Sequence, residues 1–164
     1  MAEIFRGRFA GRIDGDFVVF LIGMRVNKPH QVHKWMPVVR AMPRMLAELK
    51  RRPELGLLHA ESYLSGRTVM VLQYWRSFEL LHAYAHAKDL EHLPAWAAFN
   101  RAIGGNGSVG IFHETYSVSA GRYETVYANM PRMGMAAAGE MVPATGRMKD
   151  ARSRMKGEAG PTED

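Results

Sequence analysis

The stretch Val69-Met-Val-Leu-Gln-Tyr-Trp75, together with residues 77–100 that follow it, decides how this chain folds. Its first part is an almost wholly apolar run rich in β-branched and aromatic residues, which is typical of a buried strand. Ser77 is a good helix N-cap, and apolar residues recur after it at helical spacing, at Phe78, Leu81, Tyr84 and Ala85. We therefore predict a buried strand that runs straight into a helix, and we expect any functional site to border this unit.

The segments on either side complete a regular alternation of strands and helices. Strands are predicted over 17–26, 57–64 and 109–118, and an amphipathic helix over 31–52. Pro37 is expected near the start of the main helix, and Pro43 is expected to kink it. The resulting order, β-α-β-β-α-β, predicts a ferredoxin-like α+β fold with an antiparallel sheet. A further strand over 123–130 extends this domain, which spans residues 1–131.

Two further features do not follow from this alternation: what covers the second face of the sheet, and the structure of the C-terminal residues. Helices of a ferredoxin-like domain cover one sheet face only, yet the predicted strands are apolar on both faces, so we expect a homodimer in which a second copy covers the other face. A long helix or the C-terminal segment is the alternative cover. Residues 132–164 are rich in Gly, Ala and Met and then charged, which predicts a flexible tail. Its methionines, with Met130, could close over an apolar pocket: Met133, Met135 and Met141.

The composition excludes several kinds of site. The chain has no cysteine, which rules out disulfides, thiolate metal sites and a cysteine nucleophile. No apolar run reaches the roughly 18 residues of a membrane span, and no secretory signal pattern opens the chain, so a cytoplasmic protein without a membrane partner is expected. A net charge of +6 raises the question of nucleic-acid binding. We rank that function last because no zinc-finger, helix-turn-helix or RNA-recognition pattern is present.

Histidines supply the candidate polar groups. His113 lies mid-strand beside Glu114, and neighbours on a strand face opposite sides, so the two cannot form a simple acid–base pair. His59 and Glu61 share a strand face and can pair across the sheet. His82 and His86 lie four residues apart on the predicted helix, a spacing that can hold a metal ion from one helical face. Only one side of that helix can face the core, either the side of His82 and His86 or the side of Tyr84.

Four segments carry a resemblance to a known family. They are 71–78 (VLQYWRSF), 92–96 (HLPAW), 110–116 (GIFHETY) and 123–131 (YETVYANMP). They resemble the dimeric α+β-barrel monooxygenase superfamily. More narrowly, they are similar to a monooxygenase-like family related to the polyene-cleaving oxygenase of fumagillin biosynthesis. The resemblance implies an oxidoreductase of secondary metabolism that acts on an apolar, conjugated small molecule in a barrel pocket.

The superfamily also implies site residues. It includes haem-degrading monooxygenases and haem-dependent aldoxime dehydratases, so the resemblance suggests haem as cofactor, with His92 as the axial metal ligand and Trp75 and Trp96 beside the macrocycle. We expect His113, Tyr84 and Trp75 as catalytic residues. One alternative is a cofactor-independent monooxygenase of the antibiotic-biosynthesis type, in which His, Tyr or Trp side chains stabilise a substrate anion. Another is a non-catalytic small-molecule-binding or assembly protein.

Overall fold

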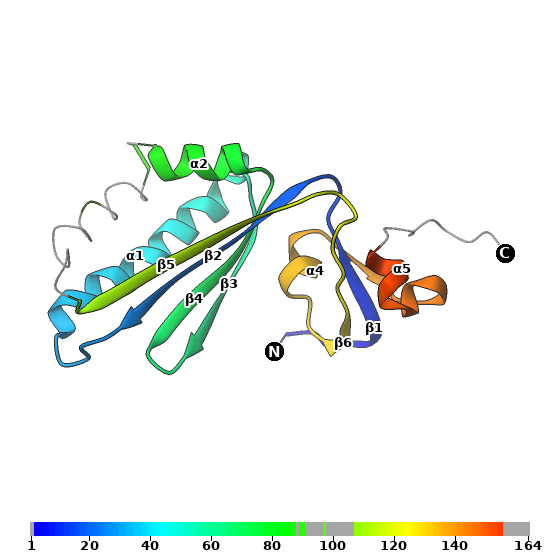
Figure 1. The fold of residues 1–164 in the computed structure, drawn as a ribbon, viewed down its shortest axis with the longest axis horizontal. Helices are drawn as coiled ribbons and strands as arrows, with labels where there is room; N and C mark the ends of the chain where they lie inside the picture. The colour runs from blue at the N-terminus through cyan, green and yellow to red at the C-terminus, as the bar shows by residue number, and fades with distance from the viewer. Residues whose placement is uncertain (1, 88, 91–96, 98–106, 156–164) are drawn as a thin grey trace.

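The structure is a computed structural model that describes residues 2–87, 89, 90, 97 and 107–155. Within these residues the chain forms two antiparallel sheets (Figure 1). The larger one, here called the central sheet, has the strand order β3-β4-β2-β5. Its strands are β2 (Phe17–Val26), β3 (Leu57–Ser65), β4 (Thr68–Trp75) and β5 (Val109–Val118).

Two helices cover one face of the central sheet (Figure 1): α1 (Val32–Arg51) and α2 (Phe78–His86). The turn η1 (Pro53–Leu55) connects α1 to β3. Ser77 caps α2 as predicted, because its Oγ accepts the Leu80 N–H at 3.2 Å. The α+β fold is therefore confirmed. The later part of the predicted second helix, 91–96 and 98–100, lies outside the described residues.

The sequence predicted that the main helix begins near Pro37, but α1 already begins at Val32. Pro37 and Pro43 both lie inside one helix that runs from Val32 to Arg51. Each proline removes a backbone donor and leaves a carbonyl without its helical partner. Both prolines are on the exposed side of α1, where water can bind that carbonyl. Pro37 therefore does not begin a separate helix.

The two faces of the central sheet are packed by different sets of residues. On the helix-facing side, Val18 and Trp75 pack with residues of both helices, and the buried cluster also contains Leu49, Leu81, Tyr84 and Leu90. On the other side, here called the outer face, Phe17 and Tyr74 pack with Ile13 and Met135. Both faces are therefore apolar, as the sequence predicted.

A second, smaller sheet joins the two ends of the chain (Figure 1). Its order is β6-β1-β7, with β1 (Phe5–Arg12), β6 (Tyr127–Met130) and β7 (Glu140–Pro143). Both neighbours run antiparallel to β1; for example, Phe9 lies opposite Tyr127 in β6 and Pro143 in β7. Two side chains add bonds to the β1 backbone. The Tyr123 hydroxyl bonds to both the N–H and the carbonyl of Ile13, and the Thr125 hydroxyl does the same at Gly11.

The flexible tail predicted from residue 132 has to be corrected for residues 134–155. These residues form α4 (Gly134–Ala138), β7, the turn η2 (Gly146–Lys149) and α5 (Ala151–Met155). Small residues allow α4 to approach β1 closely: a Cβ on Gly11 would lie 2.6 Å from the Ala136 nitrogen. The Gly- and Ala-rich composition thus reflects close packing and not disorder. Residues 156–164 lie outside the described part.

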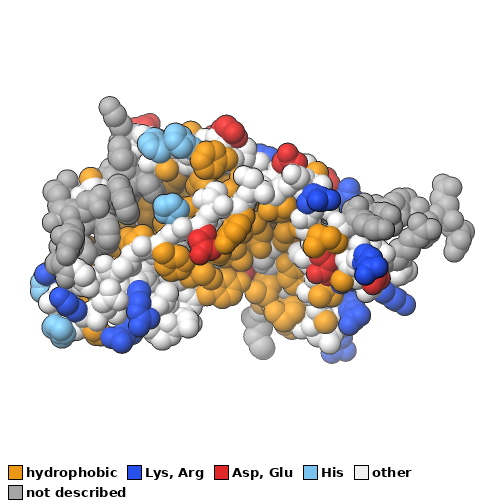
Figure 2. Space-filling model, viewed as in Figure 1, with side chains coloured by type: hydrophobic (Ala, Val, Ile, Leu, Met, Phe, Trp, Pro, Cys, Tyr) orange, Lys and Arg blue, Asp and Glu red, His pale blue; other side chains and the backbone are white. Residues whose placement is uncertain are grey.

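One methionine of the predicted lid, Met135, belongs to the core. Met135 is 6% exposed and packs with Ile13, Phe17 and Tyr74 on the outer face, away from the helices. Figure 2 shows hydrophobic side chains gathered where the central sheet meets the smaller sheet. The C-terminal segment therefore covers part of the outer face. Among the described residues, no helix combines the length and the apolar character that crossing a membrane requires.

Candidate active site

The helix-facing side of the central sheet holds a buried layer of polar and aromatic groups. Trp75 ends β4 and is 1% exposed, and its indole Nε1–H donates a hydrogen bond of 2.8 Å to Oε1 of Gln73. Gln73 is 4% exposed and lies on the same side, two residues earlier in β4. A buried amide costs free energy unless its polar atoms are used, and this bond fixes both side chains. The predicted Trp75 is thus held rigidly, and Gln73 is a site residue that the sequence analysis missed.

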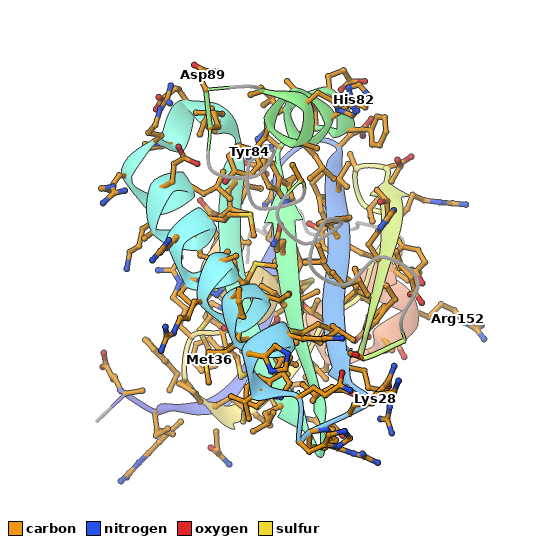
Figure 3. The ribbon with its side chains drawn as sticks, turned by 90° about the vertical axis from the view of Figure 1, so that its left-hand side faces the viewer. Lys28, Met36, His82, Tyr84, Asp89 and Arg152 are labelled. Atoms are coloured by element: carbon orange, nitrogen blue, oxygen red, sulfur yellow. The ribbon has the colours of Figure 1, made fainter. Side chains whose placement is uncertain are left out.

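Tyr84 joins this layer from α2. Its ring lies 5.9 Å from the indole of Trp75, and its hydroxyl donates a hydrogen bond of 3.0 Å to Oε2 of Glu48 in α1. Tyr84 is 4% exposed and faces the sheet, whereas His82 is exposed (Figure 3). The side of α2 that carries Tyr84, and not the side that carries His82 and His86, therefore faces the core. One aromatic–carboxylate pair therefore links both helices over β4.

His113 belongs to the same side of the sheet but to the edge strand β5. It lies opposite Ile22 in the β2–β5 register, and its ring is 5.7 Å from the ring of Phe20. Glu114 points to the outer face, where it accepts a hydrogen bond of 2.5 Å from the Tyr116 hydroxyl. The two neighbours thus face opposite sides, as predicted. Unlike Trp75 and Tyr84, His113 is exposed.

The haem prediction names three residues, of which the structure describes Trp75. His92 and Trp96 lie outside the described residues. A side chain that borders a macrocycle needs a free ring face, but the indole of Trp75 packs against Tyr84 and other core residues and is almost fully buried. The described residues around Trp75 therefore do not fit a haem. They also contain no cluster of three or more metal-ligating His, Cys, Asp or Glu side chains.

A second polar cluster lies on the outer face, where β3 meets α4. The carboxylate of Glu61 accepts hydrogen bonds from His59 Nε2 at 3.0 Å, from the Tyr63 hydroxyl at 2.6 Å and from the Gly134 N–H at 3.0 Å. His59 and Glu61 pair along one strand, and not across the sheet as the sequence analysis expected. The Gly134 bond ties the start of α4 to the central sheet.

Burial and hydrogen bonds shift the pKa values of this cluster. Burial alone would raise the pKa of Glu61, but the bonds from Tyr63, His59 and Gly134 together outweigh it and hold this pKa below its ordinary value. The bond to Glu61 raises the pKa of Tyr63 to about 12. Burial raises the pKa of Tyr74 to about 12. The cluster is therefore a carboxylate surrounded by neutral phenols at neutral pH.

A cavity of about 200 Å³ lies beside β1, away from both clusters. Its lining includes Arg12, Tyr123 and Arg154. The Arg154 guanidinium is already paired with Glu124 and also donates to the carbonyl of Met148. These bonds hold α5 against the segment that precedes β6, so the charged groups of this cavity serve the fold.

The matching family model covers the central sheet and its helices. The model for Monooxygenase af470-like proteins matches residues 17–135. The chain belongs to this family. The match begins at the first residue of β2 and ends inside α4, so the Monooxygenase af470-like unit contains the buried Trp75–Gln73 layer, the exposed His113 and the Glu61 cluster.

A curated relative in this family comes from Aspergillus fumigatus. The chain is 32% identical over 151 residues to that protein, Monooxygenase af470, and the alignment covers 79% of this chain and 53% of the relative. The chain thus spans about half the length of the curated relative that it matches. The predicted resemblance to a monooxygenase-like family is confirmed.

Solved structures show weaker similarity. SnoaB, a cofactor-independent oxygenase from Streptomyces nogalater, is 14% identical, with 63% of this chain and 93% of SnoaB covered at a TM-score of 0.45. A conserved protein from Bacteroides thetaiotaomicron is 13% identical, with 63% and 99% covered at a TM-score of 0.46. Because these similarities are low, the fold assignment depends on the strand order of the central sheet and not on these structures.

Proposed function

We propose that this chain is a monooxygenase domain that oxidises an apolar, conjugated small molecule on the helix-facing side of the central sheet, without a resident cofactor. The observation that carries the proposal is the layer of indole, amide, phenol and carboxylate groups buried between the sheet and the helices. These groups form hydrogen bonds in an apolar environment, where such bonds are stronger than in water. Membership in a family named after a monooxygenase gives the reaction type.

The chemistry needs a substrate that supplies its own electrons. A CH₂ group activated by conjugation loses a proton to a base, and the resulting carbanion transfers an electron to O₂. Recombination forms a C–O bond and a hydroperoxide, which takes back the proton. Loss of water then breaks the O–O bond, so CH₂ and O₂ become C=O and H₂O. Both electron pairs come from the C–H bonds, and no external reductant is required.

Different residues of this chain have different roles in that reaction. His113 is the base, because among the described residues it is the exposed imidazole on the helix-facing side of the sheet, and the Phe20 ring beside it offers an apolar surface for a flat substrate. Trp75 and Tyr84 hold the wall of the layer in place through Gln73 and Glu48. Trp75 and Tyr84 are almost fully buried, and a flat substrate lying on Phe20 would displace water from the exposed His113 imidazole. Exclusion of water favours a substrate anion that reacts with oxygen instead of with a proton.

The alternative is a haem-dependent monooxygenase with His92 as the ligand of the iron. Since the residues around Trp75 do not fit a macrocycle, we derive no step through it. An absorption spectrum of the chain after addition of haemin, compared with that of His92→Ala, tests this alternative. A Soret band that His92→Ala abolishes, together with oxidation that requires haemin, would overturn the cofactor-free proposal.

The direct test uses dithranol, a tricyclic ketone with an activated CH₂, and measures anthraquinone formation and O₂ consumption by the full chain. We expect turnover without added cofactor, and incorporation of one ¹⁸O atom from ¹⁸O₂. His113→Ala should lower kcat by about 10²-fold or more, the usual contribution of a general base. His33→Ala, which changes an exposed histidine of α1, should leave kcat unchanged. Binding of dithranol without oxidation would indicate a non-catalytic binder instead.

A further inference from the structure

The histidine pair of α2 is not used by the proposed oxygenation. His82 and His86 are both exposed, while Tyr84 on the opposite side of the helix is buried against the sheet. Their rings are stacked, with centroids 4.1 Å apart and ring planes 26° from parallel. In Figure 3, His82 lies on the side of α2 that points away from the sheet. The two rings therefore lie close together on an accessible surface.

One hydrogen bond fixes the tautomer of the neutral His86 ring. Nδ1 of His86 lies 2.8 Å from the carbonyl oxygen of His82. A carbonyl oxygen can only accept a hydrogen bond, so Nδ1 carries the hydrogen, and in the neutral ring the lone pair is on Nε2. Metal-binding histidines are commonly oriented in this way, with one ring nitrogen donating to a carbonyl or carboxylate and the other binding the ion.

We propose that His82 and His86 form a surface site for a borderline divalent cation such as Cu²⁺ or Zn²⁺. Neutral imidazoles suit these ions, and the ordinary affinity order favours Cu²⁺. Two nitrogens bound to one tetrahedral ion lie roughly 3.3 Å apart, given metal–nitrogen distances of about 2.0–2.1 Å. Stacked rings direct their lone pairs along nearly parallel lines, so both side chains must rotate until the two ring planes converge on the ion. Water or a group from another molecule would complete the coordination.

The environment of the pair agrees with a cation site. Glu79 lies three residues before His82, and its carboxylate adds negative charge on the same stretch of α2. The pair is also at the C-terminal end of the helix, where carbonyl groups favour positive charge. The Phe78 ring lies 5.9 Å from the His82 ring, tilted by 44° to it, and restricts that ring. The site is separate from the proposed oxygenation, because His113 and Trp75 belong to the sheet, whereas His82 and His86 lie on the exposed side of α2.

The test is a Cu²⁺ titration of the full chain at pH 7.5, followed by electron paramagnetic resonance and by competition with a chromophoric chelator. We expect one equivalent of Cu²⁺ with a micromolar Kd and hyperfine structure from two imidazole nitrogens. His82→Ala and His86→Ala should each weaken binding at least tenfold and leave one nitrogen, while His33→Ala should change neither readout. Lowering the pH to 5.5 should also weaken binding, because protons compete for the ring nitrogens.

A second readout separates this site from non-specific binding by other histidines. Zn²⁺ should raise the thermal midpoint of the wild-type chain, because an ion that bridges two turns stabilises α2 in the folded state. The double variant His82→Ala/His86→Ala should fold, as judged by circular dichroism, and show no such increase. Equal affinity, stoichiometry and nitrogen count in the wild type and the double variant would overturn the proposal.

Discussion

At the residue scale, the bond between Trp75 and Gln73 is the most sensitive contact of the helix-facing layer. Gln73→Leu removes the acceptor and leaves a buried indole N–H without a partner, which should lower the free energy of unfolding by about 1–3 kcal/mol. Urea unfolding measures this loss. The double variant Gln73→Leu/Trp75→Phe removes donor and acceptor together, so its loss should be smaller than the sum of the single losses. Additive losses would show that the bond contributes nothing.

Glu61 makes stability depend on pH. Its pKa is lowered in the folded protein, so its contribution is fully present above the ordinary carboxyl range and is lost as pH falls through the folded value. Glu61→Gln should therefore be less stable than the wild type at pH 7, and the difference should shrink toward pH 3. Urea unfolding at both pH values checks this. A constant difference would assign the effect to packing and not to charge.

At the element scale, the close approach of α4 to β1 depends on Gly11. A Cβ there would lie 2.6 Å from the Ala136 nitrogen, and backbone atoms cannot yield as a flexible side chain can. Gly11→Ala should thus lower stability by about 1–3 kcal/mol, the usual cost of overpacking. Gly110→Ala in β5 is the matched control, since the nearest atom to its Cβ is 3.7 Å away. Thermal midpoints compare the two.

Elements with clear periodicity could be predicted from sequence. The run Val69–Trp75 and the cap at Ser77 fixed β4 and α2, and the β-α-β-β-α-β order followed. Continuity of α1 through Pro37 and Pro43 could not be predicted, because it depends on which side of the helix meets solvent. The packing of α4 on β1 could not be predicted either, since its partner lies more than a hundred residues away, at Gly11.

Some residues of the candidate site could be predicted from the sequence, and others could not. The placement of Trp75 and Tyr84 on the helix-facing side follows from strand parity and helical spacing. Gln73 was missed, although a lone amide within an apolar strand was a usable signal. The Glu61 cluster depends on Gly134, which the composition of its segment had placed in a tail. Contacts that cross between distant segments carry no local pattern in the sequence.

At the scale of the whole molecule, residues 132–155 should be required for a stable fold. A chain ending at Pro131 would lose β7 and α4, leaving one edge of β1 unpaired and exposing the outer-face residues that pack on Met135. We expect a lower thermal midpoint and increased binding of a hydrophobic dye. If the truncated chain melted like the full one, the smaller sheet would be a dispensable addition.

The pairing of β1 with both β6 and β7 also has a consequence for the order of events during biosynthesis. Phe9 of β1 finds its partners at Tyr127 and Pro143, near the opposite end of the chain. On the ribosome, β1 must therefore remain unpaired until residues 127–143 have been made. The central sheet can form in the meantime, because its hairpin and helices need only nearby segments. Residues 140–143 thus complete the sheet that residues 5–12 begin.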